Sequence, residues 1–190
     1  MRTCLPCLPL VYTTLLFSGC SSSPNRIELF DGHSLNGWSG PGPWQVQEGA
    51  IVYPPTGRLE ESLVASQELE GPLQVSLEIQ LIGRRNEDGR GFWLKSAEHE
   101  IHVRVDNSPN EFSLTVVPDR YDVSRRHPLS EDEWYLLSCR VDANGQIRAW
   151  LNGSNELRST WLGTFPITLG IECQRSGGRF RNIVVTRTAP

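Results

Sequence analysis

The feature that most constrains the fold is an alternation of apolar and polar side chains that recurs along the chain. Residues 75–81, 101–105 and 147–151 each have an apolar residue at every second position. A period of two is typical of half-buried β-strands. Short turn-forming clusters such as Glu87-Asp88-Gly89 and Asn144-Gly145 separate these segments. We therefore expect an all-β sandwich or jelly roll of antiparallel strands, with at most one or two short helical turns.

Two hairpins can be registered from this pattern. A loop at Ala143-Asn144-Gly145 pairs Val141 with Ile147 and Cys139 with Ala149, and Gly145 suits the left-handed position of a three-residue loop. Loops at 96–99 and 107–110 predict a three-stranded meander with one apolar and one polar face. In this register Lys95 lies opposite Glu100, Trp93 opposite His102, His102 opposite Thr115, Arg104 opposite Ser113, and Asp106 opposite Glu111.

The first residues have the composition of a lipoprotein signal peptide. Arg2 is followed by an apolar run from Leu5 to Phe17 that is shorter than the ~20 residues a transmembrane helix needs. The run ends in Ser18-Gly19-Cys20, which resembles a bacterial lipobox. We expect a signal peptide over 1–19, a polar tether over 20–26 and a single domain over 27–190. Cys20 is then a lipid anchor that holds the protein in the bacterial cell envelope, with ordinary secretion or a misassigned start codon as alternatives.

Charge and cysteine content exclude several classes of partner. The chain has 18 basic and 22 acidic residues, and a net charge of −4 argues against non-specific binding to nucleic acid or to an anionic membrane. A zinc site is not expected, because the chain has no CxxC motif and no clustered histidines. Cys139 and Cys173 both fall in the apolar register of their strands. In an oxidising compartment they form either a disulfide or two buried thiols, and the sequence leaves both open.

Four segments resemble one known family. They are Leu29-Phe30-Asp31-Gly32 with Gly37-Trp38, Trp44-Gln45-Val46 with Gly49-Ala50-Ile51, Glu133-Trp134, and Phe180-Arg181-Asn182-Ile183. In this order they are similar to the conserved motifs of the 3-keto-disaccharide hydrolase domain family, from about residue 27 to 187. The resemblance implies a concanavalin A-like lectin/glucanase jelly roll of two antiparallel sheets that acts on glycans. In the middle strands the chain has Gly89, Lys95 and His102 where the family has Asn, Arg and Gln, and one extra residue precedes Asp106.

The resemblance also implies where a sugar would bind. In this fold the outer face of one sheet binds glycans, and the polar face of the meander would belong to that sheet. Glu100 and Asp106 lie roughly 20 Å apart along their strand, too far for the carboxylate pair of an ordinary glycosidase. A partner carboxylate would have to come from another strand, and Glu172 and Glu78 are the candidates. The alternative for each of these residues is a solvated surface side chain.

A 3-keto sugar requires different chemistry, because its ketone acidifies the proton on C2. The site needs a base for that proton, a group that stabilises the enolate, and an acid for the leaving group. Resemblance and geometry point to Glu100 or His102 as base and acid, and to Arg104 or a bound divalent cation for the enolate. The substrate-binding candidates are Trp93, Lys95, Asp106, Thr115 and Glu172.

Three functions compete at this stage. The first is a hydrolase or lyase of 3-keto-glycosides. The second is a non-catalytic carbohydrate-binding module, which the altered middle motifs favour. The third is an interaction domain on the cell surface. The expected partners are a carbohydrate or 3-keto-glycoside and, through the lipid alone, a membrane; no nucleic acid is expected.

Overall fold

The computed structural model describes residues 25–55, 61–83, 89–106, 110–118, 121–131 and 133–188. The predicted signal peptide and Cys20 lie outside the described residues. The described part of the chain contains strands and no helix. The strands are β1 (Arg26–Glu28), β2 (Trp38–Ser39), β3 (Gln45–Gln47), β4 (Ala50–Tyr53), β5 (Glu61–Ala65), β6 (Leu73–Ile82), β7 (Gly89–Lys95), β8 (Glu100–Asp106), β9 (Glu111–Val117), β10 (Tyr121–Arg126), β11 (Trp134–Val141), β12 (Gln146–Leu151), β13 (Ser154–Thr160), β14 (Thr168–Cys173) and β15 (Gly177–Arg187).

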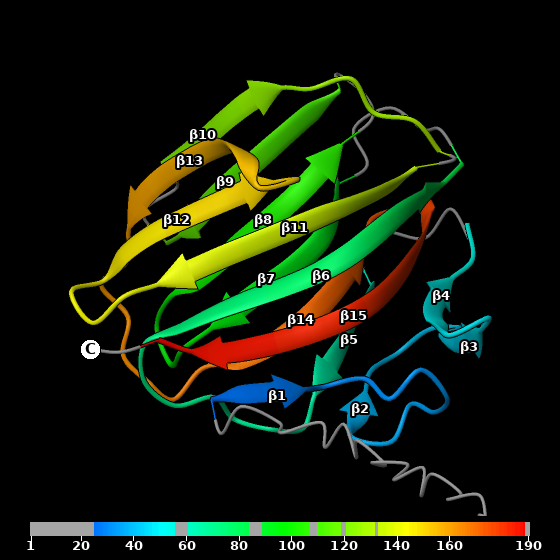
Figure 1. Ribbon diagram of the computed structural model, residues 1–190, viewed down its shortest axis with the longest axis horizontal. Helices are drawn as coiled ribbons and strands as arrows, with labels where there is room; N and C mark the ends of the chain where they lie inside the picture. The colour runs from blue at the N-terminus through cyan, green and yellow to red at the C-terminus, as the bar shows by residue number, and fades with distance from the viewer. Residues whose placement is uncertain are drawn as a thin grey trace, which may run out of the picture.

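The strands form two antiparallel sheets that stack as a sandwich (Figure 1). The eight-stranded sheet has the order β13-β12-β11-β6-β15-β4-β3, and β1 pairs with β15 beside this path. The seven-stranded sheet has the order β10-β9-β8-β7-β14-β5-β2. Neighbouring strands are often distant in sequence, since β14 lies between β7 and β5, and β6 lies between β11 and β15. This architecture confirms the predicted all-β jelly-roll sandwich.

Both predicted hairpins have the expected register. Val141 pairs with Ile147 and Cys139 with Ala149 between β11 and β12. Gly145 has a φ of 70°, the left-handed conformation that its loop requires. In the meander, Lys95 lies opposite Glu100 and Trp93 opposite His102. The pairs His102 with Thr115, Arg104 with Ser113, and Asp106 with Glu111 also match the prediction.

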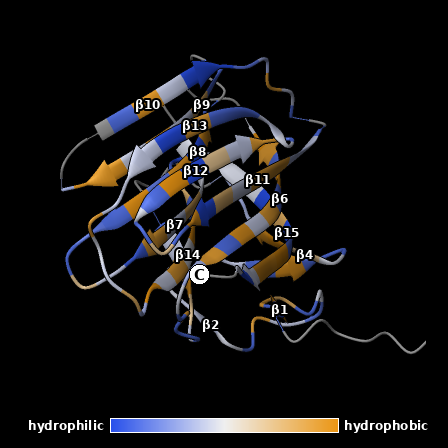
Figure 2. Ribbon diagram, turned by 60° about the vertical axis from the view of Figure 1, so that its left-hand side comes forward, coloured by the Kyte–Doolittle hydropathy of each residue, from blue (hydrophilic) through white to orange (hydrophobic). Residues whose placement is uncertain are grey.

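The core lies between the two sheets and is built from the apolar half of each alternation. Figure 2 shows this pattern as hydrophobic and hydrophilic segments that alternate along the strands. Every residue of the core cluster lies between Phe30 and Val185. Cys139 on β11 and Cys173 on β14 are both fully buried, and both are free thiols. The disulfide that the sequence left open is therefore not present, and the alternative of two buried thiols is what the structure shows.

The family-like motifs hold the margins of the sandwich together. The indole Nε1 of Trp38 donates to the carbonyl oxygen of Leu29 at 2.8 Å, which closes the loop between the two ends of the opening motif. The guanidinium of Arg181 stacks 3.9 Å from the ring centroid of Trp134 and also donates to Glu78 at 2.7 Å. Glu78 thus lies on the outer face of the eight-stranded sheet. The suggestion that Glu78 could partner a carboxylate of the meander is wrong, because the meander belongs to the other sheet.

Candidate functional site

Strand order brings the polar residues of three strands together on the outer face of the seven-stranded sheet. Paired residues on neighbouring strands point to the same face. Glu172 of β14 pairs with Gly91 of β7, which in turn pairs with Arg104 of β8. In the next row, Gly170 of β14 pairs with Trp93, which lies opposite His102. Glu172 and Arg104 are therefore separated only by a strand that has no side chain at that point.

Arg104 holds Glu172 in a bidentate ion pair across this gap. The Arg104 Nε donates to Glu172 Oε1 at 2.6 Å, and one terminal guanidinium nitrogen donates to Oε2 at 2.8 Å. The Glu172 side chain is 0 % exposed, although it stands on the outer face of its sheet. A carboxylate this deeply buried is tolerated only when it is paired and hydrogen-bonded. This pair is therefore the fixed centre of the site.

His102 connects the buried pair to the surface. Its Nδ1 lies 3.1 Å from Glu172 Oε1, and its Nε2 lies 3.3 Å from Glu100 Oε2. Glu100 also forms an ion pair with Lys95. Exposure rises outward along this chain, from 11 % for the His102 side chain to 28 % for Glu100 and 53 % for Lys95. We call these five residues the polar chain: Glu172, Arg104, His102, Glu100 and Lys95.

Glycines let the larger side chains of the site lie flat on the sheet. A Cβ added to Gly170 would lie 2.2 Å from the indole of Trp93, so the ring occupies the space above that glycine. The Trp93 Nε1 donates to Ser62 Oγ at 3.2 Å, which fixes the ring toward β5. A Cβ at Gly89 would lie 3.0 Å from the Arg104 Cδ. The half-buried Trp93 indole thus forms a flat apolar surface beside the polar chain.

Both carboxylates of the polar chain stay ionised at neutral pH. Burial by itself would raise the pKa of Glu172, but hydrogen bonds from Arg104 and His102 outweigh it and lower the pKa to about 2. Burial would also raise the pKa of Glu100, and the contacts with Lys95 and His102 reverse the effect and lower it. The Nδ1 of His102 lies between Glu172 Oε1 and a terminal guanidinium nitrogen of Arg104, 3.0 Å away, and its Nε2 lies against Glu100. The ring is thus positioned to pass a proton to or from Glu100.

The structure gathers most of the residues predicted from sequence. Lys95, Glu100, His102, Arg104 and Glu172 form the polar chain, and Trp93 flanks it. Thr115 faces His102 from β9, and Asp106 lies beyond Arg104 at the end of β8.

Sequence reasoning missed two polar residues in this sheet. The contact of Ser62 with Trp93 could not be predicted from local sequence, because Ser62 belongs to β5, which is distant in the chain. Arg90 is fully buried on the core side of β7, where it donates to the carbonyl oxygen of Gly83 at 2.8 Å. Arg90 alternates in phase with the apolar residues Phe92 and Leu94, and this spacing was the sequence signal that indicated its burial.

The described residues do not assemble a site for the divalent cation considered from sequence. Both oxygens of Glu172 already accept hydrogen bonds from Arg104. No group of three or more His, Cys, Asp or Glu residues in the described ranges is arranged to ligate a metal. The positive charges at the site come instead from Arg104 and Lys95.

Solved structures with the same fold include several carbohydrate-binding proteins. The carbohydrate-binding module CBM66 from Bacillus subtilis is 12% identical with a TM-score of 0.65, covering 79% of this chain and 95% of its own. The Crh5 transglycosylase in complex with NAG is 7% identical with a TM-score of 0.71, covering 87% and 85%. The exoplasmic/lumenal domain of VIP36 in its Ca²⁺/Man3GlcNAc-bound form is 11% identical with a TM-score of 0.67, covering 87% and 89%. At these identities the likeness shows the fold alone.

The family assignment comes from the sequence itself. No curated protein matches the chain. The profile of the 3-keto-alpha-glucoside-1,2-lyase-like domain matches residues 25–186, nearly the whole described part. That range includes both end motifs and every residue of the polar chain. The chain therefore belongs to the 3-keto-alpha-glucoside-1,2-lyase-like domain family.

Proposed function

We propose that the protein cleaves 3-keto-glycosides by elimination and hydration, and that the polar chain is its catalytic centre. The observation that supports this most directly is the continuous path of contacts from the buried Glu172 through His102 to the exposed Glu100. A carboxylate that orients a histidine, which in turn contacts a second carboxylate, is an arrangement suited to moving protons. Membership of the family supplies the substrate class.

In the first step Glu100 acts as the base. Its Oε2 takes the proton from C2 of the keto sugar, and the electron pair of the C2–H bond moves to the oxygen at C3 as an enolate. Lys95 and Arg104 are the cations that stabilise the enolate charge. The pair of Arg104 with Glu172 keeps both groups fixed, so we assign Glu172 a positioning role.

In the second step the enolate re-forms its carbonyl and the C1–O bond breaks. A proton from His102 Nε2 goes to the leaving oxygen, which departs as an alcohol. Water then adds at C1 and a proton returns to C2, so the released sugar keeps its ketone. The sum is the glycoside plus one water giving the free 3-keto sugar and the alcohol.

Trp93 is the proposed platform for the sugar ring. Its indole is held flat over Gly170 and fixed by Ser62, beside His102 in the same row of the sheet. Aromatic rings that lie flat and half-buried offer apolar area to the C–H face of a sugar. Thr115, on the other side of His102, and Asp106, beyond Arg104, would contact sugar hydroxyls.

A second candidate function is a carbohydrate-binding module without turnover. It is favoured by His102, which stands where the family motif has Gln, and by Arg104, whose guanidinium is already committed to Glu172. Under this hypothesis the polar chain orients hydroxyl groups and Trp93 provides the affinity. Trp93→Ala would then abolish binding, and no substrate would be consumed.

We also propose that the protein is anchored in the bacterial envelope by a lipid on Cys20. The support is the sequence alone, namely the apolar run, the lipobox and the polar tether. None of the described segments forms a helix long and apolar enough to cross a bilayer. In cells, Cys20→Ser should abolish labelling with radioactive palmitate, and continued labelling would contradict the anchor.

The proposed activity is tested with the chain from residue 20 to 190 bearing Cys20→Ser, here called the leaderless chain. It contains the complete core, because every core residue lies between Phe30 and Val185. It is incubated with an aryl 3-keto-α-glucoside and with the unoxidised glucoside, and release of the aryl alcohol is followed. We expect release from the keto sugar alone, reduced at least a hundredfold by Glu100→Gln and by His102→Ala.

Glu48→Gln is the matched control, because this exposed carboxylate lies between β3 and β4 at the other sheet, where it forms an ion pair with Arg179. It should retain full activity. No release from the keto sugar, together with measurable glycan binding that Trp93→Ala removes, would favour the binding module. Equal release by Glu100→Gln and by the unmodified chain would refute the assignment of the base.

A further inference from the structure

Four arginines that are far apart in sequence form one straight row across the eight-stranded sheet. Arg140 of β11 lies directly opposite Arg148 of β12, and Arg148 lies opposite Arg158 of β13. On the other side the row continues through Gln74 of β6 and Thr186 of β15 to Arg26 of β1. All four arginines are exposed. In Figure 1 the row follows the side of the sheet where β11 and β13 end and where β1 and β12 begin.

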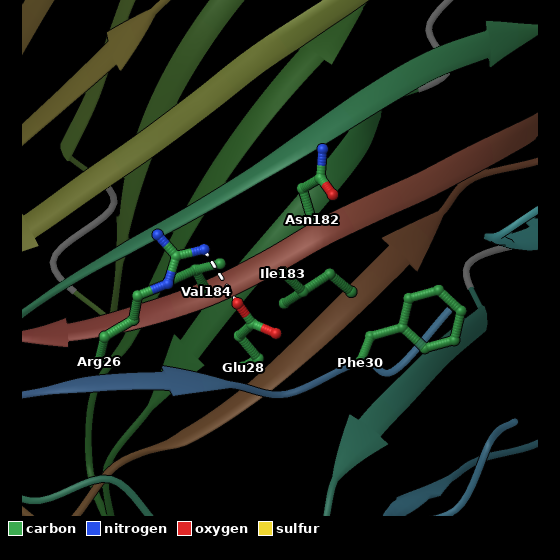
Figure 3. A pocket seen from close by; sticks show the side chains of 6 residues that line it. All are labelled: Arg26, Glu28, Phe30, Asn182, Ile183 and Val184. Atoms are coloured by element: carbon green, nitrogen blue, oxygen red, sulfur yellow. Dashed lines mark hydrogen bonds and ion pairs between the residues drawn. The ribbon is translucent and has the colours of Figure 1, made fainter. Parts of the chain in front are cut away.

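The row of arginines lowers the stability of the folded protein when no partner is bound. Like charges directly opposite each other on neighbouring strands repel, and here three stand side by side with strands about 4.8 Å apart. Two carboxylates lie against the row, and one of them, Glu156, acts electrostatically on Arg148 as well as on Arg158. Arg158 is paired with Glu156. Arg26 is paired with Glu28 at 3.1 Å, and a dashed line marks this second pair in Figure 3. Among the described residues Arg140 forms no ion pair, so the four arginines carry more positive charge than Glu28 and Glu156 neutralise.

We propose that this row docks the domain on the anionic phospholipid headgroups of a bilayer. Exposed guanidinium groups bind phosphate oxygens, and each basic residue near an anionic lipid surface adds favourable energy. The position of the row in the chain supports the same partner. Arg26 follows Cys20 by six residues in the sequence, and six residues of extended chain span at most about 20 Å. A lipid on Cys20 would therefore enter the bilayer close to one end of the row.

Docking through this face also fixes the orientation of the site. The two sheets pack against each other through their inner faces, so their outer faces point in opposite directions. With the arginine row on the bilayer, the polar chain on the seven-stranded sheet points away from it. The domain would then present its glycan-binding face to soluble or wall-bound sugars. The docking does not depend on whether that face is catalytic.

The test uses the leaderless chain, which has no lipid, so that any binding comes from the protein surface. Co-sedimentation with vesicles of phosphatidylglycerol and phosphatidylcholine is measured at 20 and 200 mM salt. We expect binding to phosphatidylglycerol vesicles at low salt, weaker binding at high salt, and none to pure phosphatidylcholine. The triple variant Arg140→Gln/Arg148→Gln/Arg158→Gln should bind about a hundredfold more weakly, at about fivefold for each arginine.

The matched control is Arg125→Gln/Arg126→Gln/Arg175→Gln. These three arginines are also exposed but lie outside the eight-stranded sheet, in β10 and in the turn after β14, and the change in net charge is the same. The control should keep vesicle binding, and both variants should keep the far-UV spectrum of the unmodified chain. Absence of vesicle binding, or an equal loss in the two triple variants, would overturn the proposal. Binding to a soluble anionic polysaccharide but not to vesicles would also overturn it and assign the row to such a polymer.

Discussion

Neutralising Glu172 should destabilise the whole domain, because the carboxylate is the buried centre of the polar chain. Glu172→Gln keeps the size of the side chain but removes its charge and leaves Arg104 without its bidentate partner. The pKa of Glu172 is lowered from 4.5 to about 2 in the folded protein. A shift of that size corresponds to about 3 kcal/mol of stability, similar to the cost of breaking a buried ion pair from one side. For a domain of this length we expect the Tm at pH 7 to fall by about 6–12 °C.

The pH dependence of this effect has a definite sign. Because the folded pKa of Glu172 lies below its unfolded value, the stabilisation is complete above about pH 4.5 and is lost as the pH falls toward 2. The difference in unfolding free energy between the leaderless chain and its Glu172→Gln variant should therefore shrink over that interval. Urea unfolding at pH 7, 4.5 and 3 measures it, with the exposed Glu98→Gln as control. A difference that is absent at pH 7, or as large at pH 3 as at pH 7, would refute the reasoning.

Three further predictions concern other parts of the molecule. Gly170→Ala places a methyl group 2.2 Å from the nearest ring atoms of the Trp93 indole, so the ring must move. The variant should therefore bind glycan about three- to tenfold more weakly and show a shifted tryptophan fluorescence. Unchanged affinity would exclude Trp93 as the platform. Burial raises the pKa of the Cys139 thiol to about 12 and also raises the pKa of the Cys173 thiol. Neither thiol should react with a thiol reagent in the native leaderless chain, and both should react in urea. Rapid labelling of the native chain would contradict their burial. Arg140→Gln relieves repulsion with Arg148 and should raise the Tm by about 1–4 °C. A lower Tm would mean that Arg140 is a structural residue.

The sequence was sufficient for the local structure of the meander but not for the assembly of the site. The register of β7, β8 and β9 could be predicted because the loops between them are short and the alternation fixes which side chains share a face. The position of β14 beside β7 is a long-range pairing that leaves no mark on local periodicity. The burial of Glu172 and its clamp by Arg104 across Gly91 could therefore not be predicted. Glu78 was placed wrongly for the same reason, since nothing near it shows to which sheet β6 belongs.

The distribution of charge on the surface could not be predicted from the sequence either. The net charge of −4 argues against non-specific binding to nucleic acid or to an anionic membrane, and no run of basic residues in the sequence indicates a basic patch. The arginine row exists because the registers of β1, β11, β12 and β13 bring together residues spread from Arg26 to Arg158. Total charge describes the whole molecule, whereas binding depends on where the charges lie.

The central claim is that the protein removes the proton on C2 of a 3-keto sugar, and solvent deuterium tests it most directly. The leaderless chain is incubated with an aryl 3-keto-α-glucoside in D₂O, and the released sugar is analysed by NMR at early times against an enzyme-free sample of the same sugar. Elimination and hydration predict deuterium at C2 of the enzymatic product beyond the enzyme-free level, and no enrichment with Glu100→Gln. Release of a sugar that keeps its original hydrogen at C2 would contradict the account.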